Sequence, residues 1–96
     1  IKKKGVNNVV IWGTGEFSRY LLDTATEHEF IISGVVDGVE KKWGSNFMGF
    51  EVQSPQYLIG RESDIIIASV NFYGEIFNKI ISLGISKDKV MPNFLL

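Results

Sequence analysis

Residues Val9–Ser18 constrain the fold of this chain most strongly. The stretch reads VVIWGTGEFS, an apolar run that ends at a Gly-x-Gly turn and continues into helical spacing. Gly13 can adopt backbone angles that a side chain forbids, and Gly15 lets a ligand lie against the main chain. The first N–H groups of a helix that begins at Glu16 favour negative charge at the same place. The stretch therefore predicts a strand–turn–helix unit with a phosphate-binding loop at Gly13, Thr14 and Gly15.

The loop departs from the G-x-G-x-x-G pattern at its third glycine, where Ser18 stands. Serine is small enough to let a helix and a strand pack closely, so the departure is compatible with the fold. Glu16 lies in the first helical turn, where its charge would repel a pyrophosphate and counts against a tightly bound dinucleotide. A tight strand–helix turn without any ligand remains the alternative, because a fold does not imply a function.

The rest of the chain alternates predicted strands and helices, as an α/β fold does. Strands are predicted at 9–12, 30–37, 47–52, 64–69 and 89–91, and helices at 16–27, 54–59 and 73–83. The right-handed crossover rule places the first two strands side by side, with the strand from Asp64 on the other side of the first. The prediction is a Rossmann-like three-layer sandwich with a mainly parallel sheet, in an order near 3-2-1-4-5.

Polar residues follow the predicted strands at the edge where parallel α/β sheets bind ligands. Asp37 ends the second strand 24 residues after Gly13, the spacing of an acid that accepts from ribose hydroxyls. The alternative is a turn-forming Asp-Gly pair. Ser69 and Asn71 follow the strand from Asp64 as candidate ligand contacts or as plain turn residues. Trp43 is a candidate for stacking on a base, or for closing a small core.

Composition excludes several classes of function. The 96 residues predict one domain, 1–96, and the start at Ile1 with an apolar end at Phe94–Leu96 predicts a fragment of a longer protein. A net charge of −1 argues against a nucleic-acid partner. The chain has no cysteine and no apolar run long enough for a membrane span, and no signal peptide is recognisable, so we expect a cytoplasmic protein. The single histidine, His28, gives no basis for a catalytic triad or a metal site.

The chain resembles the Rossmann-like module of bacterial polysaccharide-biosynthesis proteins over nearly its whole length. Similar modules stand at the N-terminus of amino-sugar acyltransferases and of membrane-linked nucleotide-sugar dehydratases. The resemblance is carried by VIWGTGE at 10–16, GVVD at 34–37, KWG at 42–44, FMGFEV at 47–52, SP at 54–55 and DIIIAS at 64–69.

The resemblance implies a nucleotide-sugar ligand near the glycine loop. It implies that Gly13, Thr14 and Gly15 cradle phosphate. It also implies that Asp37 meets ribose or base and that Ser69 flanks the sugar or phosphate.

Three functional hypotheses follow. The first is non-catalytic binding of a nucleotide or nucleotide-sugar, as one domain of a sugar-modifying transferase in surface-polysaccharide synthesis. The second is the NAD(P)-binding half of an oxidoreductase. The third is an interaction module with a degenerate site, which predicts a homodimer through an apolar face such as Phe94–Leu96.

Overall fold

The computed structural model describes residues 7–28 and 30–91 of the chain. Its strands are β1 (Asn7–Trp12), β2 (Phe30–Val36), β3 (Asn46–Phe47), β4 (Phe50–Gln53) and β5 (Asp64–Ile67), and its α-helices are α1 (Glu16–Thr24) and α2 (Tyr73–Ser82). Short 3-10 helices occupy Ala25–His28, Glu40–Lys42, Pro55–Leu58 and Lys87–Lys89. The predicted helix at 16–27 thus tightens after Thr24, and the helix predicted from Ser54 is a single 3-10 turn.

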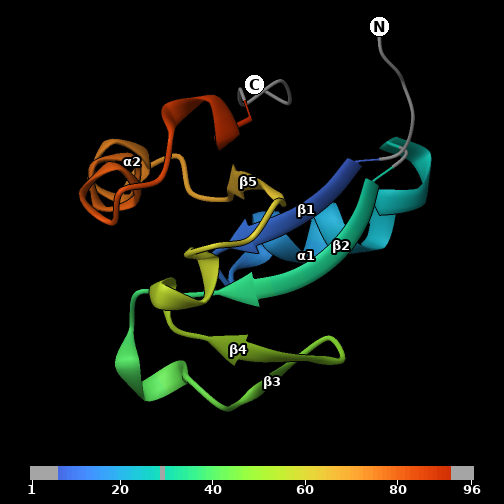
Figure 1. Cartoon of the computed structure of the whole chain (residues 1–96). Coiled ribbons are helices and arrows are strands. Elements are labelled where there is room, and N and C mark those ends of the chain that lie inside the picture. Colours follow the sequence, from blue (N-terminus) through green and yellow to red (C-terminus); the bar gives the residue numbers. More distant parts are fainter. Residues whose placement is uncertain (1–6, 29, 92–96) are drawn as a thin grey trace, which may run out of the picture.

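The strands form one mixed, mostly parallel sheet in the order β3-β4-β2-β1-β5. β1 pairs in parallel with both β2 and β5, and β2 pairs in parallel with β4. Figure 1 shows this sheet with α1 behind β1 and β2, and with α2 beside β5. The α/β class and the parallel centre of the sheet agree with the prediction, whereas the strand order differs from it at both edges.

One edge differs because the predicted strand 47–52 is a hairpin. β3 and β4 pair antiparallel across a turn at Met48 and Gly49, whose φ angles are +52° and +95°. Positive φ at both central residues is the signature of the tight turn that matches the twist of two strands. The Asn46 side chain supports the turn by accepting a hydrogen bond from the Gly49 N–H at 3.1 Å.

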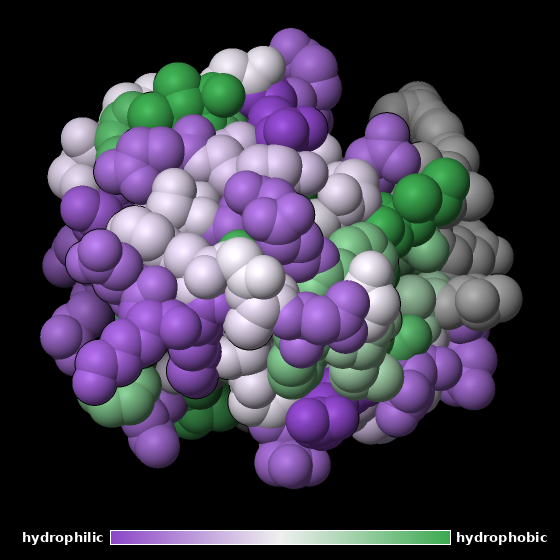
Figure 2. All heavy atoms as spheres, turned by 90° about the horizontal axis from the view of Figure 1, so that it is seen from below, coloured by the Kyte–Doolittle hydropathy of each residue, from purple (hydrophilic) through white to green (hydrophobic). Residues whose placement is uncertain are grey.

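The hairpin places the two-residue strand β3 at the edge of the sheet. The molecule is seen from the hairpin side in Figure 2, where hydrophilic residues cover much of the surface. A short edge strand with polar surroundings gives another chain little to pair with.

The other edge differs because the predicted last strand, 89–91, is largely absent from the sheet. Ser86 Oγ accepts from the Asp88 N–H at 3.2 Å and starts the 3-10 helix Lys87–Lys89. Val90 then makes a single parallel bridge with Ile65. The apolar residues Phe94–Leu96, which the interaction hypothesis invoked, lie outside the described residues.

Alternate residues of β1 enter two different core clusters. Val10 and Trp12 pack with Ile80 of α2, whereas Val9 and Ile11 pack with Leu21 of α1. Neighbouring side chains of a strand point to opposite faces, so the two helices pack on opposite faces of β1. This explains the continuous apolar run of β1, in which residues 9–12 are all buried. None of the described helices is long and apolar enough to cross a membrane.

Candidate nucleotide-binding site

An open cavity of about 610 Å³ lies at the carboxyl ends of β1, β2 and β5. Five of the six predicted site residues line it: Gly13, Thr14, Gly15, Asp37 and Ser69. Asn71 is exposed and is not among the described residues that line it. The remaining lining residues are Trp12, Gly38, Val39, Lys42, Ala68, Phe72, Glu75, Ile76 and Lys79.

The two glycines of the loop, Gly13 and Gly15, differ in whether the fold itself requires a glycine. Gly13 has a φ of +130°, and a Cβ placed on it would lie 3.2 Å from the Ala68 carbonyl oxygen. Its N–H donates to the Val36 carbonyl at 2.8 Å, so Gly13 ties the end of β1 to β2. Gly15 has an ordinary φ of −102°, and a Cβ there would meet nothing within 4 Å. Packing within the described residues therefore requires glycine at 13 but not at 15.

Ser18, at the position of the missing third glycine, is fully buried between the helix and the loop. Its Oγ donates to the Gly13 carbonyl at 2.7 Å. The hydroxyl thus gives a partly buried backbone acceptor a hydrogen-bond partner. This agrees with the expectation that serine still allows α1 to pack closely on β1.

Asp37 is the centre of a hydrogen-bond network at the end of β2. Its side chain is 10% exposed; Oδ1 accepts from the Val39 N–H at 2.8 Å, and Oδ2 accepts from Thr14 Oγ1 at 3.0 Å. The Val39 bond is the local turn that the sequence left open as an alternative. The Thr14 bond joins the Asp37 side chain to the glycine loop. Asp37 therefore holds both the glycine loop and the turn at Val39, which line this end of the cavity.

Lys42 completes the network and was not predicted as a site residue. Its Nζ donates to Thr14 Oγ1 at 2.9 Å and lies 3.8 Å from Asp37 Oδ2. Its side chain is about half exposed and faces the cavity beside the glycine loop. In the sequence, Lys42 was noted only within the KWG stretch at 42–44, and no local pattern marked it as a site residue. A turn closed by the bond from its N–H to the Val39 carbonyl at 2.9 Å brings it back to the loop.

We expect Asp37→Ala to lower the free energy of unfolding by about 1–2 kcal/mol, because it leaves the Val39 N–H and the Thr14 hydroxyl without their acceptor. Water in the open cavity can replace the lost acceptor, so the loss of stability is smaller than it would be at a fully buried site. Urea denaturation of the variant measures the change.

Asp37→Asn is the matched control, since it keeps one oxygen acceptor and the size of the side chain. Its loss should be smaller than that of Asp37→Ala. Equal stability of the wild type and Asp37→Ala would contradict a structural role for the carboxylate.

The opposite wall of the cavity comes from α2 and the segment before it. Ser69 Oγ accepts from the Phe72 N–H at 3.1 Å, which is the turn role that the sequence left open. Glu75, Ile76 and Lys79 follow along α2 and line the cavity. Neither Glu75 nor Lys79 was predicted as a site residue, because helical spacing does not tell which exposed residues border a cavity.

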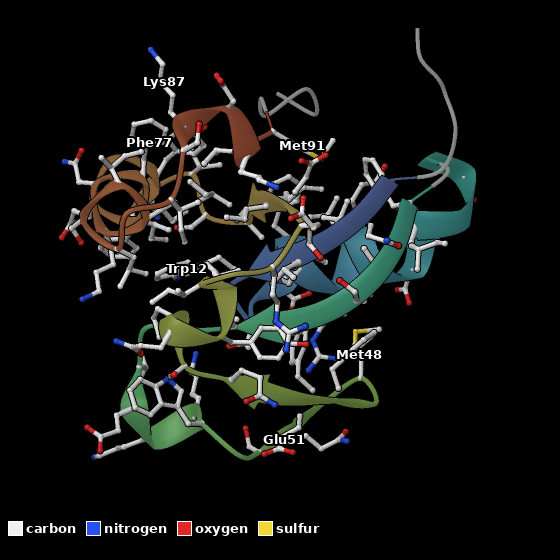
Figure 3. All side chains as sticks on the ribbon, viewed as in Figure 1. Trp12, Met48, Glu51, Phe77, Lys87 and Met91 are labelled. Carbon is white, nitrogen blue, oxygen red and sulfur yellow. The ribbon has the colours of Figure 1, made fainter. Side chains whose placement is uncertain are left out.

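A second cavity of about 330 Å³ adjoins the first and shares Trp12, Gly38 and Lys79 with it. Its other lining residues are Trp43, Pro55 and Gln56. Trp12 lies at the carboxyl end of β1, between α2 and the segment of the Pro55–Leu58 helix (Figure 3). The described residues contain no group of His, Cys, Asp and Glu side chains that could hold a metal ion.

Comparisons with solved structures show the Rossmann-type fold. UDP-D-quinovosamine 4-dehydrogenase from Vibrio fischeri matches with a TM-score of 0.67 at 21% identity, over 93% of this chain and 80% of that chain. The Rex-family repressor RSP matches with a TM-score of 0.64 at 18% identity, over 84% of this chain and 43% of the repressor. RSP in complex with NAD+ and operator DNA matches with a TM-score of 0.61. This chain therefore spans less than half of the repressor.

Sequence comparison identifies the family. No curated protein matches the chain. The model of the family described as C2185-like, N-terminal matches residues 5–91, which include the whole described fold from β1 to the bridge at Val90. The chain belongs to the C2185-like N-terminal family.

Proposed function

We propose that this chain is a domain that binds a nucleotide or nucleotide-sugar without catalysing a reaction itself. The observation that carries the proposal is the convergence of the glycine loop, Asp37 and Ser69 on one cavity at the carboxyl ends of three parallel strands. Ligands of open α/β sheets bind at this place, where the strand order reverses. The cavity volume of about 610 Å³ lies within the range of small-molecule sites.

The chemistry of the loop end favours a pyrophosphate there. Gly15 leaves open space against the main chain, and the start of α1 has no side-chain cap, so its first N–H groups are available to an anion. Lys42 adds a cation beside Thr14. Glu16, whose charge the sequence analysis set against a pyrophosphate, is not among the described residues that line the cavity.

A nucleotide-sugar is our first candidate ligand and NAD(P) the second. The first is supported by the resemblance to polysaccharide-biosynthesis modules and by the fold shared with an enzyme named for a UDP-sugar. The second is supported by the fold shared with a repressor crystallised with NAD+. On the first reading, the chain is one domain of a longer, cytoplasmic, sugar-modifying enzyme of bacterial surface-polysaccharide synthesis.

A thermal-shift screen against UDP- and CDP-sugars, NAD, NADP and coenzyme A tests the proposal. A ligand at 100 times its Kd adds about 2.7 kcal/mol of stability. For a domain of this size each kcal/mol raises Tm by roughly 4–8 °C. A shift with a nucleotide-sugar alone supports the first candidate, and a shift with NAD or NADP alone supports the second. No shift with any of them contradicts the proposal and favours an interaction module.

We expect Gly15→Ala to weaken binding about tenfold or more while lowering the stability of the free protein by less than about 1 kcal/mol, since Gly15 is the N-cap of α1. The added methyl group takes up open space at a residue that lines the cavity, and overpacking against a ligand there costs about 1–3 kcal/mol. Calorimetric titration of the ligand found in the screen measures the affinity.

Gly74→Ala is the matched control. Gly74 lies in α2, its Cβ would also meet nothing within 4 Å, and it is not among the described residues that line the cavity. Its affinity should equal that of the wild type. Equal binding by Gly15→Ala would mean that the ligand does not approach the loop.

A further inference from the structure

Trp43 is a large aromatic residue that the protein's own packing leaves 38% exposed. It is absent from the hydrophobic clusters formed by the described residues, so it does not close the core as one reading of the sequence suggested. Its indole Nε1 nevertheless donates to the Asp37 carbonyl at 2.7 Å. The ring is therefore held in one orientation by the same residue that organises the phosphate end of the site.

The held ring borders the second cavity, which adjoins the first. The three shared residues, Trp12, Gly38 and Lys79, form the junction between the two. A volume of about 330 Å³ is at the lower end of the range for small-molecule sites. Together the cavities fit a ligand with two parts, one beside the glycine loop and one beside the indole.

The lining of the second cavity suits a planar heterocycle. Trp43 and Pro55 offer apolar surface, and the Gln56 amide offers both a donor and an acceptor for the edge of a ring. Base–aromatic stacking tolerates any base, because every base has a π face. Lys79 stands at the junction, where the anionic part of a nucleotide would pass between the two cavities.

We propose that the second cavity binds the nucleobase by stacking on Trp43, with the phosphates in the first cavity. This inference rests on the proposed function. It assigns the base of the ligand to the second cavity and its phosphates to the first. Inorganic pyrophosphate, which has no ring, then depends on the glycine loop alone, whereas ADP and UDP depend on both cavities.

Calorimetric titration of ADP, UDP and inorganic pyrophosphate into the wild type, Trp43→Leu and Trp43→Phe tests the assignment. We expect Trp43→Leu to weaken ADP and UDP binding about tenfold or more, as loss of a stacking partner does. Pyrophosphate affinity should stay the same in all three proteins. Trp43→Phe keeps an aromatic face and should retain most of the nucleotide affinity. Melting temperatures of the free proteins establish that each variant is folded.

Indole fluorescence gives a second measurement that does not require Trp43→Leu to fold. Nucleotide should quench the emission of the wild type more strongly than that of Trp43→Phe, in which only Trp12 remains. Pyrophosphate should change the emission of the two proteins by the same amount, because Trp12 is present in both.

The outcomes separate this inference from the proposed function. A wild type that binds neither nucleotides nor pyrophosphate overturns both. Nucleotide binding that is unchanged in both variants overturns the stacking assignment and leaves the function standing. Equal weakening of pyrophosphate and nucleotides also overturns it, because Trp43 would then act only by holding the Asp37 loop.

Discussion

Replacing Gly13 with alanine is expected to lower the free energy of unfolding by about 2–4 kcal/mol, from backbone strain and overpacking together. Gly13 has a φ of +130°, which side chains rarely tolerate. The added Cβ would lie 3.2 Å from the Ala68 carbonyl oxygen and 3.3 Å from Ser18 Oγ. Neither atom can move easily, since Ala68 follows β5 and its N–H donates to the Trp12 carbonyl at 3.0 Å, while Ser18 is fully buried.

Urea denaturation of alanine variants at two further glycines separates the two causes of this loss, backbone strain and overpacking. Gly44 has a φ of +85° but open space around its Cβ, so Gly44→Ala reports strain alone, about 1–2 kcal/mol. Gly15→Ala has neither strain nor contact, so its loss should stay below about 1 kcal/mol, the size expected from a weaker N-cap. A Gly13→Ala loss no larger than that of Gly44→Ala would mean that the contact with Ala68 relaxes freely.

The parts of the site that could be predicted are those fixed by local chemistry. A Gly-x-Gly turn between an apolar run and a helical pattern predicts its own geometry, and the structure places Gly13 at positive φ. The carboxyl ends of parallel strands meet at one edge of a sheet, so Asp37 and Ser69 were predicted to lie near the loop, and both line the cavity. Their function as ligand contacts stays a prediction.

The parts that could not be predicted depend on tertiary contacts between distant segments. Lys42 meets Thr14 across 28 residues of sequence, and no local pattern encodes that pairing. The turn at Met48 and Gly49 was missed because an alternation of apolar residues at 48, 50 and 52 continues across it. The exposure of Trp43 depends on how the loop after β2 folds back on Asp37.

α2 forms one wall of the cavity, and Ile80 is the one residue of that helix that is fully buried. Ile80→Ala is expected to lower the free energy of unfolding by about 2–5 kcal/mol, because it leaves a cavity between α2 and the face of Val10 and Trp12. At roughly 4–8 °C per kcal/mol, this loss lowers Tm by roughly 8–40 °C. Differential scanning calorimetry of the variant measures both quantities.

Ile81→Ala is the matched control, since it removes the same atoms from the next residue of the same helix. Ile81 is 41% exposed, so its loss should stay below about 1 kcal/mol, with the higher helix propensity of alanine offsetting part of it. Equal losses at 80 and 81 would contradict the packing of α2 on the sheet. Ile76 and Lys79 lie on this helix and line the first cavity. If α2 detaches in Ile80→Ala before the sheet unfolds, ligand affinity should therefore fall at temperatures where the strands are still intact.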